Sequence, residues 1–406
     1  MSGILKEACL KAWKVSGLFG LASRSHYRNS RLLVLGFHGV SLYDEHRWDP
    51  SLYLSVENFH RRMEALKRAR CAVVTLDEGL RLIKQGKLPE RAVALTFDDG
   101  TYDFYKVVRP ILKAFGYPAT LYLTTYYAQL QYPSTPGIWS YMLWKAKGSR
   151  INAGDVLGTG VEFNIADEAG RTEALQRIIS RADSQGMDGH QKNELSEKLA
   201  RVLGLDFEAL VSSRIIRLLK PEEVGKLAQD GVSVQMHMHR HCCPSAREAY
   251  LDNLQTNRNL ISEMTGSEPT HFCYPSGDYT SESVSWLREY GVASATTCDV
   301  GLMSAKTDPL LIPRLIVTSS LSDVAFESWL VGIGAIVSRS VRKLAGLARV
   351  TPTGKPLEDP QPRKSAPSSH SDLNDQMAKT RLGSEGPGRP ETTDDAGVSR
   401  RTGTDG

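Results

Sequence analysis

Short apolar runs alternate with helix-like segments along much of the chain, and this alternation is the feature that most constrains the fold. Runs typical of buried strands occur near residues 32–37, 71–75, 92–97 and 119–123. Helical spacing of apolar residues separates them, and the same rhythm returns near residues 232, 272, 293 and 311. Repeated strand–helix units predict an α/β protein with a parallel sheet, either open or closed into a barrel.

Three segments interrupt or flank this rhythm. Residues 149–220 are polar, charged and helix-prone, which predicts a helical insertion between core strands. Residues 351–406 contain no aromatic residue and are rich in Pro, Ser, Gly and Thr. Such a segment cannot bury enough apolar surface to offset its ordering entropy, so we expect a disordered tail. The main domain is then expected over residues 29–345, after an amphipathic helix at residues 1–28.

Composition excludes several classes of protein. The chain has 406 residues and a net charge of +4 without a long basic block, so we expect no nucleic-acid partner. The six cysteines form no CxxC pair, which favours free thiols in a reducing compartment. No apolar run reaches the roughly 18 residues that a membrane span needs. These features predict a cytoplasmic protein.

Both ends of the folded part carry amphipathic patterns. Leu5, Cys9, Leu10 and Trp13 fall near one face of a predicted helix whose lysines lie elsewhere around it, and residues 326–347 mix apolar and basic residues. Such segments can lie on a membrane surface, here at its inner face. Most amphipathic helices simply pack on a core, and this second interpretation is favoured. Peripheral membrane contact stays the alternative.

Two motifs follow strand-like runs and carry the chemistry. The adjacent carboxylates Asp98 and Asp99 follow one run, and His237, His239 and His241 follow another. Asp and His are ordinary ligands of a catalytic zinc, which keeps three protein ligands and an open position for water. A carboxylate beside the metal can take the proton from that water. Since parallel α/β folds place their sites at the carboxyl ends of strands, the motifs together predict a metal site with a general base.

Each motif also has a plainer interpretation. An Asp-Asp-Gly sequence after a strand is often only a turn. A lone histidine is usually a surface or core residue, but three within five residues are less common, so the combination favours the metal site. The spacing leaves the ligand pair open. Residues 237, 239 and 241 share a face in an extended strand, whereas 237 and 241 share one in a helical turn.

The sequence Thr96-Phe97-Asp98-Asp99-Gly100, together with His237-x-x-x-His241, resembles the polysaccharide deacetylase family, the family-four carbohydrate esterases with a nodulation-type deacetylase domain. Further stretches resemble its exopolysaccharide and capsule branch, namely residues 36–40 (GFHGV), 109–113 (RPILK), 118–120 (PAT), 272–277 (FCYPSG) and 311–314 (LIPR). The resemblance covers roughly residues 30–340, which is nearly all of the expected folded part.

The resemblance implies a fold, an activity and a cofactor. The fold is a distorted (β/α) barrel with the helical insertion. The activity is removal of N-acetyl groups from amino sugars of a polysaccharide or of its lipid-linked precursor. By position, Asp98 is the general base, while Asp99, His237 and His241 hold a divalent metal, with zinc as the expected ion.

The resemblance also assigns five supporting residues. The backbone amide of Ser276 would stabilise the tetrahedral oxyanion, which is the role of a preorganised donor. Arg314 would orient Asp98, and His38 would protonate the leaving amine. Tyr274 and Pro275 would contact the substrate.

Several positions depart from the family pattern and keep alternatives open. Met236 and Met238 flank the first histidine where the family has Ser or Thr. Cys273 and Ser276 replace an arginine and an aromatic residue, and the late Leu-x-His motif is not evident. A carbohydrate-binding relative that keeps the metal but lacks turnover is therefore the main alternative. A hydrolase of non-sugar amides, with the same ligands and a different pocket, is a third interpretation.

Overall fold

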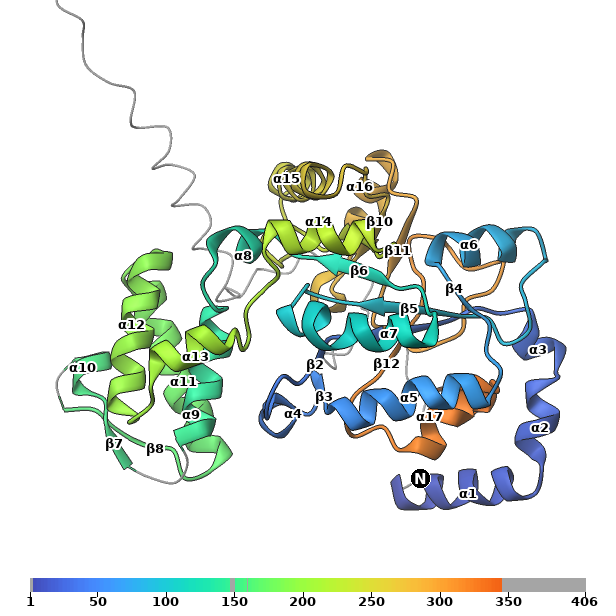
Figure 1. The fold of residues 1–406 in the computed structure, drawn as a ribbon, viewed down its shortest axis with the longest axis horizontal. Coiled ribbons are helices and arrows are strands. Elements are labelled where there is room, and N and C mark those ends of the chain that lie inside the picture. Colours follow the sequence, from blue (N-terminus) through green and yellow to red (C-terminus); the bar gives the residue numbers. More distant parts are fainter. Residues whose placement is uncertain (1–2, 147–149, 159, 345–406) are drawn as a thin grey trace, which may run out of the picture.

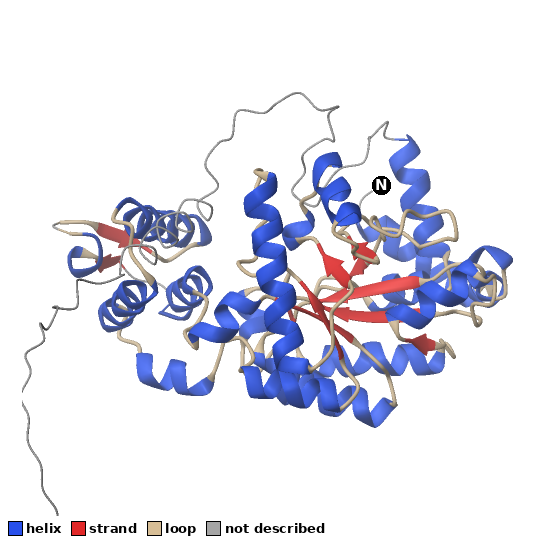
Figure 2. Cartoon of the chain, turned by 90° about the horizontal axis from the view of Figure 1, so that it is seen from above, coloured by secondary structure: helices blue, strands red, loops and turns tan. Residues whose placement is uncertain are grey.

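A curled parallel sheet lies at the centre of the fold, with helices packed around it (Figures 1 and 2). The computed structural model describes residues 3–146, 150–158 and 160–344. The main sheet has eight strands, which are β1 (Leu33–Phe37), β4 (Val73–Val74), β5 (Val93–Phe97), β6 (Thr120–Leu123), β9 (Ser233–Met236), β10 (His271–Cys273), β11 (Ser294–Thr296) and β12 (Leu315–Ile316).

The strand order runs β11-β10-β9-β6-β5-β1-β12, and β4 pairs with β5. Every residue of β1 and β5 is buried. Helices cover the outer face of the sheet and side chains fill its interior, and parallel strands covered on both faces are typically continuous apolar runs. The α/β class and parallel sheet predicted from the sequence are confirmed.

The two ends of the sheet meet through the segment that leads into β12. The amide of Ile312 donates to the carbonyl of Ala295, and the amide of Thr297 donates to the carbonyl of Ile312, both at 2.9 Å. Further along, the amide of Val317 donates to the carbonyl of Gly36 at 2.8 Å, next to the pairing of β12 with β1. One short segment thus contacts both edges of the sheet and closes a distorted (β/α) barrel, as the family resemblance implied.

Several helices begin at a residue whose side chain caps them. Ser55 Oγ accepts from the amide of Asn58, and Thr75 Oγ1 accepts from the amide of Glu78, both at 3.1 Å. The helices around the barrel are α5 (Val56–Arg68), α6 (Leu76–Lys84), α7 (Arg109–Phe115), α14 (Pro221–Gln229), α15 (Arg247–Thr265), α16 (Ser281–Glu289), α17 (Asp323–Leu330) and α18 (Ile333–Leu344). Shorter elements join them, namely β2 (Gly39–Val40), α4 (Glu45–Trp48), β3 (Tyr53–Leu54), the π-helical turn η1 (Phe104–Val108), α8 (Thr125–Leu130) and the 3₁₀ turn η2 (Pro275–Gly277).

The insertion forms a lobe beside the barrel, green in Figure 1. It has its own apolar core, with Trp139, Met142, Ile178 and Leu199 fully or almost fully buried together. The first two of these residues lie before residue 149, so the lobe begins earlier than the predicted insertion. Its elements are α9 (Thr135–Ala146), β7 (Arg150–Asn152), α10 (Gly154–Leu157), β8 (Glu162–Asn164), α11 (Glu168–Ser184), α12 (Gly189–Val202) and α13 (Phe207–Ser213).

The N-terminal segment forms three helices, α1 (Gly3–Val15), α2 (Leu18–Ser23) and α3 (His26–Asn29), where one was predicted. Leu10 of α1 is buried in a small cluster with Phe19 and Val324, which attaches the segment to α17. Among the described residues, no helix is long and apolar enough to cross a membrane. The predicted disordered tail at residues 351–406 lies outside the described residues.

Candidate active site

Asp98 and Asp99 point in different directions because the backbone turns sharply between them. Asp98 still follows the strand, since its amide donates to the carbonyl of Phe37 at 2.9 Å. Asp99 has a φ of 69°, and Gly100 follows with a φ of 85°. A Cβ on Gly100 would lie 2.3 Å from Leu123 Cδ1, so only glycine fits this turn. The two carboxylates can therefore have different partners.

The segment after β9 that carries the three histidines, residues 237–241, also turns sharply, and we call it the histidine loop. Met238 and His241 have φ values of 62° and 55°, and this backbone brings His237 and His241 to one side. Their Nε2 atoms lie 3.3 and 3.1 Å from Asp99 Oδ1. His239 points elsewhere, with Nδ1 2.9 Å from the hydroxyl of Thr125. The structure thus selects the pair that spacing left open.

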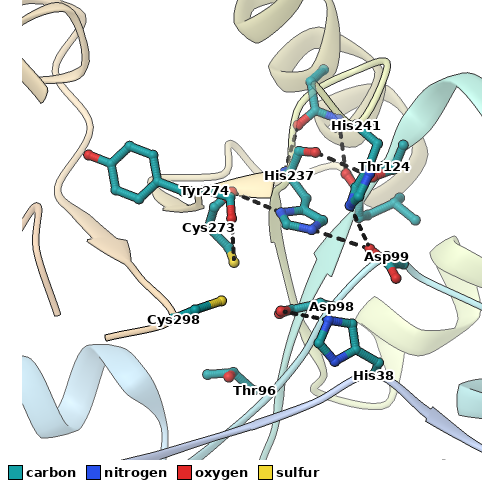
Figure 3. A network of polar contacts seen from close by, with 12 residues as sticks. His38, Thr96, Asp98, Asp99, Thr124, His237, His241, Cys273, Tyr274 and Cys298 are labelled. Atoms are coloured by element: carbon teal, nitrogen blue, oxygen red, sulfur yellow. Dashed lines mark hydrogen bonds and ion pairs between the residues drawn. The ribbon is translucent and has the colours of Figure 1, made fainter. Parts of the chain in front are cut away.

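Asp99, His237 and His241 fit a divalent metal ion. One ligand atom from each lies within 4.8 Å of the others. His237 Nδ1 lies 2.8 Å from the carbonyl of Cys273, which can only accept, so in the neutral imidazole the Nε2 lone pair faces Asp99 (Figure 3). Asp99 Oδ1 is buried and accepts no well-directed hydrogen bond among the described residues. A cation between these atoms would satisfy all three.

Charge keeps Asp99 ionised. Burial alone would raise the pKa of this carboxyl, but the adjacent His241 and His237 outweigh burial and hold it well below its ordinary value. An ionised carboxylate with two imidazole nitrogens is a common donor set for zinc. Whether these three residues bind metal stays a prediction.

Asp98 is held by Arg314. The guanidinium reaches both carboxylate oxygens, with Nη1 2.7 Å from Oδ1 and Nη2 2.8 Å from Oδ2. Burial would raise the pKa of Asp98, but the charge and hydrogen bonds of Arg314 lower it below its usual value. His38, at the end of β1, has Nε2 3.8 Å from Asp98 Oδ2. The structure therefore brings the predicted base, its predicted orienting arginine and the predicted acid together, and their catalytic roles stay predictions.

Asp98, His237 and Cys273 form a second possible donor group. It suits a metal less well, because Arg314 occupies both oxygens of Asp98 and its Nη2 lies 3.1 Å from Cys273 Sγ. Burial also raises the pKa of the Cys273 thiol, which keeps it protonated. Cys273, where the family has an arginine, here contacts Arg314, which directly precedes β12.

Two asparagines of α15, which the sequence analysis did not single out, support the histidine loop. Asn257 Oδ1 accepts from the amide of His237 at 3.0 Å, and its Nδ2 donates to the carbonyl of Leu123 at 3.0 Å. One turn earlier, Asn253 Oδ1 accepts from the amides of His239 and Arg240 at 2.7 and 3.2 Å. Their spacing of four residues on a predicted helix was a weak signal, since exposed asparagines show it too.

A pocket of about 280 Å³ opens from Asp99 and His241 toward the insertion. Aromatic side chains dominate one part of it, and the loop before α12 closes another. Residues that line it include Trp48, Tyr53, Tyr126, Tyr127, Tyr132, Met187, Gly189, Lys192 and Arg240. The insertion therefore forms a wall of the cavity, far in sequence from the Asp-Asp motif.

The third predicted motif lies differently from expectation. Tyr274 is buried, donates its hydroxyl to the carbonyl of Leu310 at 3.2 Å, and its ring points away from Asp99 (Figure 3). Pro275 is also buried. These positions correct the prediction that both side chains contact substrate, because packing inside the barrel withdraws them from the pocket. Ser276 is exposed with a φ of 56°, and the role of its amide stays a prediction.

Comparison with known proteins agrees with this arrangement. The family model described as polysaccharide deacetylase matches residues 85–153 and 165–295. This range contains Asp98, Asp99, His237 and His241, and it leaves out His38 and Arg314. The poly-beta-1,6-N-acetyl-D-glucosamine N-deacetylase of Staphylococcus aureus (strain MSSA476) is 28% identical over 109 residues, which are 24% of this chain and 38% of that protein. The match thus spans little more than a third of the relative.

Two solved structures are also similar. The Streptococcus pyogenes deacetylase PplD, in complex with acetate, aligns with a TM-score of 0.47 and 16% identity, over 72% of this chain and 94% of that one. IcaB from Ammonifex degensii aligns with a TM-score of 0.46 and 16% identity, over 75% of this chain and 97% of that one.

Proposed function

The chain belongs to the polysaccharide deacetylase family, and on that premise we propose that it is a metal-dependent hydrolase that removes N-acetyl groups from amino sugars of a polysaccharide or of its lipid-linked precursor. One observation carries the proposal. Asp99, His237 and His241 converge on a common point, while the adjacent Asp98 is held apart by Arg314. The two carboxylates can therefore perform separate tasks.

We propose zinc as the ion held by Asp99, His237 and His241. When bound, it would supply a Lewis acid that polarises the amide carbonyl and acidifies a water molecule. Asp98 remains ionised at neutral pH and would accept the proton of the attacking water. Arg314 fixes both oxygens of Asp98 and limits its rotation. His38, 3.8 Å from Asp98, would donate a proton to the departing amine nitrogen.

The pocket supports a sugar as the substrate. Pockets for small molecules are mostly apolar with a few directed polar groups, and the aromatic rings here could stack on a sugar ring. A volume of about 280 Å³ is small and suits about one sugar residue beside the site. The glycan is therefore proposed to enter with one acetamido group directed at Asp99.

Acetate release from N-acetylglucosamine oligomers, with and without a chelator, tests the proposal. We expect release that chelation abolishes and added zinc restores. Asp98→Asn should lower the rate by a factor on the order of 10² or more while the protein still binds zinc, since Asp98 acts on the proton and Asp99 on the metal. Asp252→Asn, at an exposed position of α15, is the matched control and should behave like the wild type.

Three other outcomes would point elsewhere. Equal rates for the wild type and Asp98→Asn would remove the proposed base. Saturable glycan binding without acetate release from any oligomer would favour the carbohydrate-binding alternative. Faster release from non-sugar acetamides than from sugars would favour the third interpretation.

A further inference from the structure

The N-terminal helices expose an unusual concentration of apolar side chains. Of the ten large hydrophobic residues exposed in the described part of the chain, five lie between residues 5 and 21. Val15 is 89% exposed and Leu21 is 71% exposed. Together with two exposed alanines of α1, they form what we call the terminal patch, which consists of Leu5, Ala8, Ala12, Trp13, Val15, Leu18 and Leu21.

Four residues of the terminal patch lie on the outward face of α1, and Leu18 and Leu21 belong to α2. Leu5, Ala8, Ala12 and Val15 are separated by three, four and three residues, so they share one side of the helix. The opposite side is the one that contacts the protein, because Leu10 is buried and Lys14 pairs with Glu327 of α17. An ordinary surface helix turns its apolar stripe inward. In α1 most of the apolar side chains face solvent.

Positive charge accompanies the terminal patch. Residues 1–31 contain six lysines and arginines (residues 6, 11, 14, 24, 28 and 31) and one acidic residue, Glu7. Lys6 and Lys11 are exposed. Lys11 borders the apolar side of α1, with its ammonium 3.0 Å from Glu7 on the same helix, and Lys6 lies further round the helix, beyond Trp13. An apolar face with Trp and bordering lysines is the pattern of a helix that lies in the interface of an anionic bilayer.

We propose that the terminal patch docks the protein on the surface of a membrane that contains anionic lipids. The apolar side chains of α1 and α2 insert at the boundary between headgroups and acyl chains, with Trp13 at headgroup level. Lys6 and Lys11 contact the lipid phosphates. This binding involves none of the residues of the candidate active site, so it holds or fails independently of the proposed activity.

Two other occupants fit the terminal patch less well. A second copy of the chain, paired about a two-fold axis through this patch, would bring two basic N-terminal segments together, and like-charge juxtaposition costs free energy. Residues 345–406 have no aromatic residue and few aliphatic ones with which to cover the patch. The charge of the patch therefore favours an anionic lipid surface.

Sedimentation of the full chain with phospholipid vesicles tests the proposal. We expect binding to vesicles of phosphatidylcholine mixed with phosphatidylglycerol, weak binding to phosphatidylcholine alone, and loss of binding as salt screens the lysines. Lys6→Gln/Lys11→Gln should weaken binding by roughly 30-fold. Trp13→Ser/Leu21→Ser should weaken it by about tenfold or more. Since these side chains are exposed, thermal unfolding should stay at the wild-type temperature.

Matched controls lie outside the patch. Tyr43→Ser changes a residue that is 61% exposed, and Lys84→Gln changes an exposed lysine of α6, so both should leave vesicle binding unchanged. Equal binding by the wild type and both patch variants would overturn the proposal, as would a failure to bind the mixed vesicles. A dimer of the free protein that Trp13→Ser/Leu21→Ser dissociates would also overturn it, because the occupant would then be a second copy.

Discussion

At the residue scale, the candidate site separates two adjacent carboxylates by their partners. Asp99 faces two imidazole nitrogens, whereas Asp98 is bound by a guanidinium. A positive φ at Asp99 makes the separation possible. Backbone conformations of this kind cost energy in non-glycine residues and concentrate at functional sites. Asp99, Met238, His241 and Ser276 are four of the nine such residues in the described part of the chain, and all four lie in the candidate motifs.

Removing the Arg314 guanidinium should change both stability and the pH dependence of activity. In Arg314→Gln, Asp98 stays buried without its cation, and loss of one partner of a buried pair costs about 3–5 kcal/mol of unfolding free energy. Burial then raises the pKa of Asp98, so the acid limb of the rate profile should move to higher pH. Rates measured across pH check this. An acid limb identical to that of the wild type would show that Arg314 does not control the base.

The two asparagines of α15 allow the same substitution to be compared one turn apart. Asn257→Asp keeps the acceptor for the His237 amide, but it replaces the donor to the carbonyl of Leu123 with a carboxylate oxygen, which that carbonyl repels. We expect zinc affinity to fall by about 10–100-fold, as for other groups that orient a ligand. Asn253→Asp keeps the acceptor for the amides of His239 and Arg240 and should bind zinc nearly as the wild type does. Calorimetric titration with zinc measures both, and equal affinities would contradict a positioning role for Asn257.

The buried carboxyl of Asp103 should make the stability of the protein depend on pH. It is buried, accepts from the amide of Val40 at 2.7 Å, and burial raises its pKa to about 7. A carboxyl with a raised pKa in the folded state contributes stability that is present below pH about 4 and is lost as pH rises through about 7. Asp103→Asn removes this loss. The change that it causes in the free energy of unfolding should therefore be more stabilising at pH 8 than at pH 4, by up to about 4 kcal/mol. Denaturant unfolding at both values measures the difference, and a pH-independent effect would contradict it.

At the scale of elements, the insertion is both a separate core and a wall of the pocket. Its buried side chains pack together, while Met187, Gly189 and Lys192 line the cavity that starts at Asp99. Helix α12, which begins after its N-cap Asp188, contributes residues both to the core of the lobe and to the wall of the pocket. Packing inside the lobe should therefore affect substrate binding more than metal binding.

Trp139→Ala tests this coupling. The indole is fully buried and donates to Ser196 Oγ at 2.8 Å, so its removal leaves a cavity and breaks this hydrogen bond, at a cost of about 3–5 kcal/mol. We expect KM for glycan oligomers to rise several-fold, while zinc content stays unchanged because its ligands lie on the barrel. Steady-state kinetics and metal analysis measure the two effects. Loss of zinc with an unchanged KM would contradict the division of roles.

At the scale of the whole molecule, the barrel assembles the proposed metal ligands from distant parts of the chain. Asp99 follows β5 and the histidines follow β9, so these three residues meet only when the sheet has formed. A metal that binds only the folded state stabilises it by mass action. The stability of the protein should therefore depend on the ion.

Chelation should lower the melting temperature by roughly 5 °C, and added zinc should restore it. Asp99→Asn should remove this response, whereas Asp98→Asn should keep it, because Arg314 and not the metal holds Asp98. Scanning calorimetry of the three proteins makes the comparison. A chelator response that depends on Asp98 rather than Asp99 would show that the metal is bound by the second donor group, Asp98, His237 and Cys273.

Much of the architecture is local and therefore readable from the chain. Strand and helix periodicity predicted the parallel α/β sheet, and the resemblance carried by the Asp-Asp and histidine motifs predicted the family and its distorted barrel. These features depend on residues near one another, so their spacing is enough. The limits of the insertion were less accurate, because α9 joins the lobe through contacts with residues far along the sequence.

The sequence by itself determined the α/β class, the two chemical motifs and the positions of the candidate ligands. Only the tertiary structure decided that Tyr274 turns inward, that Asn257 supports the histidine loop, and that α1 turns apolar side chains outward, and it placed beside Asp99 the two histidines that spacing alone left open. The physical reason is that side-chain direction depends on φ at residues such as Met238 and on packing partners from other elements. Spacing along one strand or helix does not identify those partners.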